Sequence, residues 1–160
     1  FDGQKVSKSR IITSVDYSMV SMEAFEIYAA NHDIHVMDFV LKLDAYSYYM
    51  MNLLDYLTGN TDRHWGNWGF LVDNRTNQPV RLFDLMDLNQ TFLAYDTPDG
   101  ANCMTTGNRK MSQREAAVEA VKNIGLNQKD EIKDEWFKGR EKEREMFWCR
   151  FGILKEQWKA

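Results

Sequence analysis

Asp62, Asn67 and Asp84 are the residues of this chain whose types and spacing could support a reaction. A carboxylate such as that of Asp62 can orient a hydroxyl group and accept its proton. Asn67 follows five positions later, and Asp84 ends the strand-like run 79–83; their side-chain oxygens are the ligands that magnesium prefers. A base, an amide and a metal-binding carboxylate in this order predict transfer of a phosphoryl group from Mg-ATP to a hydroxyl.

The residues around these three carry a resemblance to a known family. The string NTDRHWGN over 60–67 and the later Phe83-Asp84 are similar to the HipA-like bacterial serine/threonine kinases. The Asp-Arg-His-x-x-Asn order also resembles the catalytic loop of the phosphatidylinositol 3- and 4-kinases. Both families place the histidine after the catalytic aspartate, whereas ordinary protein kinases place His-Arg before it. Here His64 follows Asp62.

The resemblance implies a role for each residue of the motif. In the families that the motif resembles, the histidine supports the loop and the metal-binding aspartate from behind. Arg63 could support the transferred phosphate or face solvent. The expected set is Asp62 and His64 for catalysis and Arg63, Asn67 and Asp84 for binding Mg-ATP, with Asn67 and Asp84 as the metal ligands.

Each of these residues also has a purely structural interpretation. Asp62 follows Gly-Asn-Thr and could form a turn or cap a helix. Asn67 could bond its own backbone, and Asp84 could simply end a strand. Because the three occur together in the expected order, we favour the catalytic interpretation.

Length and composition indicate the number of domains and the location of the protein. A chain of 160 residues with 44% hydrophobic content is expected to form one domain over 1–160, and no apolar run approaches the length of a membrane span. Cys103 and Cys149 lack the spacing of a zinc site or a disulfide framework, so a cytoplasmic protein is expected.

A glycine-rich phosphate loop and a phosphate-binding lysine strand are missing from the sequence. We therefore expect the nucleotide-binding N-lobe upstream and the isolated fragment to be inactive.

The distribution of charge along the chain indicates which kinds of partner to expect. Residues 1–107 hold 7 Lys+Arg against 14 Asp+Glu, a net charge of −7, while residues 108–160 hold 13 against 10, a net charge of +3. An acidic catalytic half suits recruitment of a cation and argues against direct nucleic-acid binding, which requires clustered Lys and Arg. Residues 85–107 contain no Lys or Arg, which disfavours a lipid substrate.

Three functions remain open from the residues. The resemblance implies a protein serine/threonine kinase whose partners are a Ser- or Thr-bearing protein substrate and an antitoxin or regulatory protein. A phosphatidylinositol-kinase-like or small-molecule kinase is the alternative within enzymes. A kinase-like lobe that serves only as an interaction or regulatory module is the alternative outside them.

The hydrophobic periodicity predicts a mainly α fold with a small β-hairpin, an α+β class that matches a kinase-like C-lobe. Residues 1–20 are expected to form a loop or hinge with a strand-like run at 10–13. A catalytic loop at 59–67 leads into a metal-binding hairpin at 65–87, with strands at 65–72 and 79–83, and a long loop follows. The predicted helices span 21–31, 36–58, 112–124, 127–137 and 140–158.

Overall fold

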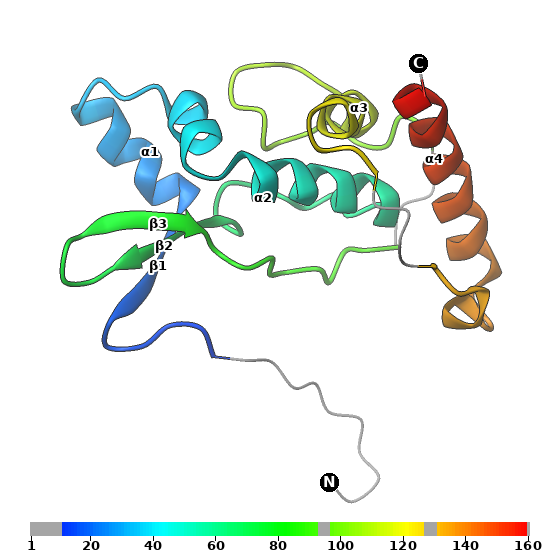
Figure 1. Cartoon of the computed structure of the whole chain (residues 1–160), viewed down its shortest axis with the longest axis horizontal. Helices are drawn as coiled ribbons and strands as arrows, with labels where there is room; N and C mark the ends of the chain where they lie inside the picture. Colours follow the sequence, from blue (N-terminus) through cyan, green and yellow to red (C-terminus); the bar gives the residue numbers. More distant parts are fainter. Residues whose placement is uncertain (1–10, 93–96, 127–130, 160) are drawn as a thin grey trace, which may run out of the picture.

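The computed structural model describes residues 11–92, 97–126 and 131–159 and has an α+β fold (Figure 1). Helices surround a central long helix, and a small antiparallel sheet lies at one end. The elements are β1 (Tyr17–Ser21), α1 (Met22–Asn31), α2 (Val36–Thr58), β2 (Gly69–Asp73), β3 (Gln78–Leu82), α3 (Gln113–Ile124), the 3-10 helix η1 (Asp134–Phe137) and α4 (Glu141–Lys159).

The ends of the helices follow from their capping residues. The Ser21 hydroxyl accepts a hydrogen bond from the backbone N–H of Ala24 (3.2 Å) and starts α1. Ser112 and Glu115 form the reciprocal capping box that starts α3. Gly59 ends α2 with φ of 64°, a left-handed conformation that glycine adopts without strain. The helices predicted at 21–31, 36–58, 112–124 and 140–158 are therefore confirmed within a residue or two.

A kink in α2 is a feature that the sequence pattern did not predict. Asp44 has non-helical dihedral angles (φ −156°, ψ 66°). Its Oδ1 accepts from the backbone N–H of Ser47 (3.1 Å), as in a helix cap, and its Oδ2 accepts from the N–H of Leu82 (3.0 Å). One carboxylate thus restarts the helix and attaches it to β3.

The sheet has the order β1-β2-β3, with both pairs antiparallel. The β2–β3 hairpin confirms the predicted one, although β2 begins later than expected, at Gly69. The expected loop over the first twenty residues is wrong at 17–20, because Tyr17–Ser21 form β1 and pair with β2 from Tyr17↔Asp73 to Ser21↔Gly69. The strand-like run at 10–13 is irregular over 11–13, and Arg10 lies outside the described residues.

The core is built around α2. In Figure 1, α2 crosses the middle of the molecule, with α3 and α4 on one side and the sheet and α1 at the other end. Buried side chains from all these elements form one connected cluster, including Met22, Tyr48, Phe70, Val121 and Leu154. The described elements therefore share one connected core.

The structure differs from the sequence prediction between α3 and α4. An α-helix was predicted over 127–137, but the described part of that range contains only the short 3-10 helix η1. Asn127, the expected cap, lies outside the described residues. Every residue of η1 is at least partly exposed, so this segment lacks the buried stripe that would hold an α-helix in place.

Across the described residues, no helix combines the length and apolarity needed to cross a bilayer.

Candidate active site

The loop at 59–67 is anchored by a buried ion pair. Arg63 is 3% exposed, and its Nε and Nη2 donate to the two carboxylate oxygens of Asp55 on α2 (2.8 and 3.0 Å). A bidentate pair of this kind fixes both the position and the plane of the guanidinium. The end of α2 and the loop are therefore joined as one unit.

The remaining terminal nitrogen of Arg63 joins two segments that are distant in sequence. Its Nη1 donates to the carbonyl oxygen of Asn67 (3.1 Å) and to that of Met86 (2.6 Å). The residues just before β2 and just after β3 therefore meet at one guanidinium. A backbone hydrogen bond also joins the two ends of the hairpin, because the N–H of Phe83 donates to the carbonyl of Gly69 (2.8 Å). Both ends of the hairpin thus emerge beside the loop.

This position of Arg63 differs from both sequence expectations. The guanidinium neither faces solvent nor is free to support a phosphate, since four hydrogen bonds to protein oxygens occupy it. It is a buried support for the candidate site.

Two further side chains complete the support. The side-chain amide of Asn60 donates to Asp55 Oδ1 (2.8 Å), and the backbone N–H of Asn60 donates to the Asp55 carbonyl (2.9 Å). From α3, the amide of Gln113 donates to the Asn60 carbonyl (2.5 Å) and accepts from the N–H of Ala101 (3.0 Å). The loop is thereby held by α2 and α3 together.

Asp62 lies at the centre of the supported loop. Its side chain is partly buried, and among the described residues no donor or cation contacts its carboxylate. Its backbone carbonyl accepts from the side-chain amide of Asn67, and its N–H donates to Asn60 Oδ1 (3.5 Å). The backbone of Asp62 is fixed while the carboxylate stays available.

Asn67 is buried, and its amide is oriented by a single interaction. The Nδ2 group donates to the Asp62 carbonyl, which leaves Oδ1 as a buried acceptor with no hydrogen-bond partner among the described residues. Buried acceptors without partners are rare in folded proteins and cost free energy. This oxygen could therefore bind a cation or accept a hydrogen bond.

Asp84 lies at the end of the hairpin, as the sequence predicts. Its side chain is 51% exposed, and its Oδ1 accepts from Nη1 of Arg81 (2.6 Å). The second carboxylate oxygen has no described partner. Asp84 thus lies in an exposed ion pair, which is weak enough to rearrange around a ligand.

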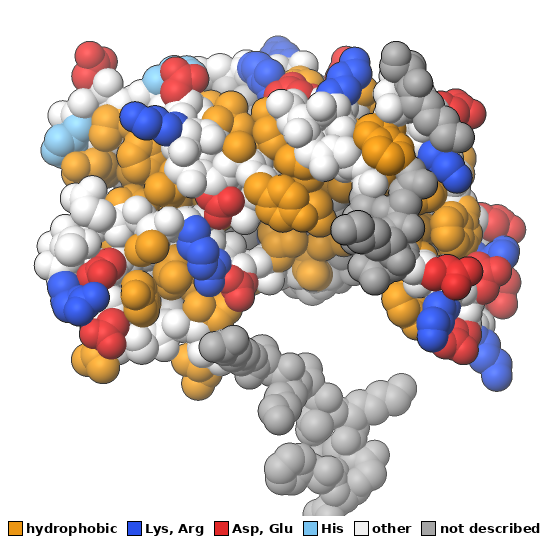
Figure 2. Space-filling model, viewed as in Figure 1, with side chains coloured by type: hydrophobic (Ala, Val, Ile, Leu, Met, Phe, Trp, Pro, Cys, Tyr) orange, Lys and Arg blue, Asp and Glu red, His pale blue; other side chains and the backbone are white. Residues whose placement is uncertain are grey.

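A hollow of about 250 Å³ adjoins Asp84. Tyr46, Met50 and Leu85 line it and are exposed by 63%, 36% and 39%, and Figure 2 shows hydrophobic side chains gathered on this face around α2. The buried Trp68 also lines it, and its indole N–H has no partner among the described residues. The hollow has mainly apolar walls, with Arg81 and Asp84 among its lining residues, while the Trp68 indole nitrogen is itself buried.

His64 is the motif residue that lies elsewhere. Its side chain is exposed, and its Nδ1 accepts from the backbone N–H of Gly66 (3.0 Å). It lines a shallow hollow beside Glu23 and Glu26 of α1. Among the described residues it has no hydrogen bond or ion pair with Asp84, so the support that the resemblance implies for that aspartate is not seen.

The oxygen donors present suit magnesium better than a softer metal. Within the described residues no group of three or more His, Cys, Asp or Glu side chains could form a metal cage. Magnesium does not need one, because it is commonly held by one or two protein oxygens together with phosphate oxygens and water. The buried, unpartnered Oδ1 of Asn67 and the second oxygen of the exposed Asp84 carboxylate are of the atom type that magnesium prefers.

A second polar cluster holds the long loop after β3 against α2. Thr105 donates its hydroxyl to Asn52 Oδ1, and Cys103 Sγ lies 3.2 Å from the Thr105 hydroxyl. Burial raises the pKa of the Cys103 thiol, and burial likewise raises the pKa of the Tyr48 phenol, whose hydroxyl donates to the Thr105 carbonyl (3.4 Å). Both groups remain neutral and serve packing.

Comparisons of the chain with protein-family models, curated proteins and solved structures found no match. Sequence reasoning missed Asp55 and Gln113, which hold the loop. Asp55 did carry a signal, because it is the one charged residue in the largely apolar run 45–58.

Proposed function

We propose that this chain is the catalytic lobe of an ATP-dependent phosphotransferase, and that its nearest functional class is the HipA-like protein serine/threonine kinases. The substrate in this proposal is a serine or threonine hydroxyl on another protein. The same proposal includes a kinase-like C-lobe fold, a cytoplasmic location and regulation by an antitoxin-like partner.

The observation that carries the proposal is the position of Arg63. Its Nη1 bonds the backbone carbonyls of Asn67 and Met86, while the rest of the guanidinium is held by Asp55. The ends of the hairpin that carry the two proposed magnesium ligands are thereby held beside the Asp62 loop. A phosphotransfer site needs this kind of fixed relation between base and metal ligands.

Each polar group has a defined task in the proposal. The Asp62 carboxylate would accept a hydrogen bond from the substrate hydroxyl and take its proton as the new O–P bond forms and the bond from the γ-phosphorus to the bridging oxygen breaks, with ADP as the leaving group. Asn67 and Asp84 would hold magnesium, which would offset the negative charge of the phosphates. The mainly apolar walls of the hollow beside Asp84 suit the aromatic base of a nucleotide.

A non-catalytic interaction module is the second candidate, and two observations favour it. Arg81 already neutralises one oxygen of Asp84, and His64 lies away from that aspartate. A lobe that has lost catalysis could keep such an ion pair at the former metal position. The apolar hollow beside Asp84 would then be a partner surface.

Phosphoryl transfer from radiolabelled Mg-ATP to protein, measured with the complete gene product, tests the proposal. Asp62→Ala and Asp84→Asn are each expected to lower transfer by at least about a hundredfold. Asp33→Asn is the matched control, since Asp33 is exposed, has φ of 53° that asparagine tolerates, and lies outside the site. Equal transfer activity in all three variants would contradict the roles assigned to Asp62 and Asp84. Absence of both transfer and nucleotide binding would favour the interaction module.

A further inference from the structure

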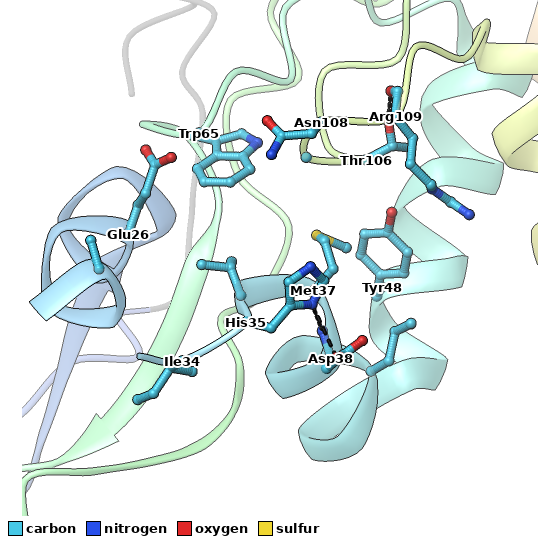
Figure 3. A pocket seen from close by; sticks show the side chains of 14 residues that line it. Glu26, Ile34, His35, Met37, Asp38, Tyr48, Trp65, Thr106, Asn108 and Arg109 are labelled. Carbon is cyan, nitrogen blue, oxygen red and sulfur yellow. Dashed lines mark hydrogen bonds and ion pairs between the residues drawn. The ribbon is translucent and has the colours of Figure 1, made fainter. Parts of the chain in front are cut away.

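A larger cavity lies on another part of the molecule, between the α1–α2 junction and the loop around 104–109 (Figure 3). Its volume is about 420 Å³, within the range of sites that hold small molecules or peptide side chains. The walls are mainly apolar and are contributed by Ala30, Ile34, Val36, Met37, Leu41 and Trp65.

The walls of this cavity are fixed before any ligand arrives. The indole N–H of Trp65 donates to the Met104 carbonyl (2.8 Å). Gly107, with φ of 65°, brings its loop so close that a Cβ there would lie 3.2 Å from Cγ of Met37. Such a cavity does not need to be ordered on binding, which lowers the cost of association.

The surroundings of the cavity are acidic. Glu26 lines it, and Figure 3 shows this side chain beside Trp65 at the rim. Glu26 also lines the neighbouring hollow of about 350 Å³, which contains Glu23 and His64. Among the described residues, neither glutamate has a hydrogen-bond or ion-pair partner for its carboxylate. Arg109 could offset this charge, but Glu119 already binds it (3.0 Å).

The two hollows adjoin one another, because Glu26, Trp65, Gly107 and Asn108 line both of them, and together they are called the groove. We propose that this groove binds a basic, amphipathic segment of a partner protein. An apolar side chain of the segment fills the larger cavity, and a neighbouring Lys or Arg lies between Glu23 and Glu26. Binding of this segment goes beyond the proposed phosphotransfer and does not depend on it.

The shape and exposure of the groove favour a peptide over a small free cation. The two glutamates are exposed at the rim, where a single ion pair contributes little. A small cation would gain too little from them to bind tightly. A chain segment instead combines these ion pairs with burial of an apolar side chain, so the contacts add along its length. Trp65 can add a cation–π contact with the basic group.

Fluorescence anisotropy with the full chain tests the proposal. The probe is a short fluorescein-labelled peptide of repeated Arg-Leu-Gly units, compared with matched Glu-Leu-Gly and Arg-Ser-Gly peptides. We expect the Arg-Leu-Gly peptide to bind with the highest affinity and to weaken as salt rises, because the carboxylates are exposed. Equal binding of the Glu-Leu-Gly peptide would overturn the proposal.

Variants of the chain locate the binding. Glu23→Gln with Glu26→Gln is expected to weaken binding by about threefold to tenfold, as loss of two exposed ion pairs implies. The matched control is Glu141→Gln with Glu156→Gln on α4, two exposed carboxylates outside the groove, which should leave binding unchanged.

A third variant blocks the cavity without changing charge. Ala30 is an exposed residue of α1 that lines the cavity, so Ala30→Phe should fill its mouth, abolish binding and leave the thermal unfolding temperature nearly unchanged. Undiminished binding by this variant, or full displacement of the peptide by an excess of agmatine, would contradict a peptide-binding groove.

Discussion

At the scale of single residues, Asp55 and Arg63 matter more to the site than several members of the motif. Both side chains are almost fully buried, at 4% and 3% exposure. Burial of two charges is costly and is offset here by two direct bonds, an amide from Asn60 and two carbonyl acceptors. Removal of either charge would leave the other buried without a partner.

Asp55→Asn should therefore lower the free energy of unfolding by about 3 to 5 kcal/mol. The matched control is Asp99→Asn, which breaks the Arg114–Asp99 pair, whose side chains are 39% and 63% exposed. That control should cost less than about 1 kcal/mol because solvent screens the pair. Urea denaturation of both variants measures the difference. Similar costs for the two would show that the buried pair is not the anchor inferred here.

At the scale of elements, the sequence predicted what local signals determine. Ser21, Gly59 and Ser112 mark helix ends through short-range hydrogen bonds, and the apolar stripe of α2 is continuous in the sequence. The kink at Asp44 could not be predicted, because it depends on a bond to Leu82, far along the chain. β1 could not be predicted either, since its stability comes from pairing with β2 and not from its own alternation.

Gly69 is the place where that pairing is tightest. A Cβ at this position would lie 2.7 Å from Cα of Ser21 and closer still to the Val20 carbonyl oxygen. Gly69→Ala should therefore separate β1 from β2 and cost about 3 kcal/mol. At Gly152 in α4, no described atom outside the adjoining helix backbone lies within 4 Å of a new methyl group, so Gly152→Ala should be neutral or stabilising by up to about 1 kcal/mol. Thermal unfolding compares them, and a neutral Gly69→Ala would exclude the close approach.

The capping box of α3 gives a pH-dependent prediction. Hydrogen bonds from the backbone N–H and hydroxyl of Ser112 hold the pKa of Glu115 below its usual value. A lowered folded-state pKa stabilises the fold above the unfolded-state pKa, about 4.3, and this contribution disappears as pH falls through the folded-state value.

The urea midpoint of the wild type should therefore exceed that of Glu115→Gln near neutral pH, and the two should converge on acidification. Glutamine keeps the capping geometry, so the comparison isolates the charge. Glu156→Gln, which removes an equal charge from the exposed part of α4, controls for net charge. A gap that widens at low pH would contradict the assignment.

At the scale of the whole molecule, the candidate site depends on contacts between distant segments. The order of Asp62, Asn67 and Asp84 could be read from the sequence. The bonds from Arg63 to Met86 and from Gln113 to Asn60 could not, because they exist only once the hairpin and α3 have packed on α2. The exposed position of His64 was missed for the same reason, since it depends on how α1 docks against the loop.

The two cysteines report on this packing. Cys149 is exposed on α4, whereas burial raises the pKa of Cys103 and Thr105 holds its thiol. At mildly alkaline pH, Ellman's reagent should react quickly with Cys149 and slowly with Cys103, because the thiolate is the reactive form. Cys149→Ser isolates the slow site, and urea should accelerate its reaction as α2 and the loop separate. Equally fast reaction of both thiols in the native protein would contradict the packing described.

The most direct test of the proposed function is manganese binding, used as a paramagnetic substitute for magnesium. Binding of Mn²⁺ with a non-hydrolysable ATP analogue would be measured by electron paramagnetic resonance on the complete gene product. We predict that Asp84→Asn weakens binding by at least about tenfold, while Arg81→Gln, which frees the Asp84 carboxylate, preserves or tightens it. If both variants weaken binding alike, or if neither changes it, then Asp84 is only an ion-pair partner and the metal site is not where we propose it.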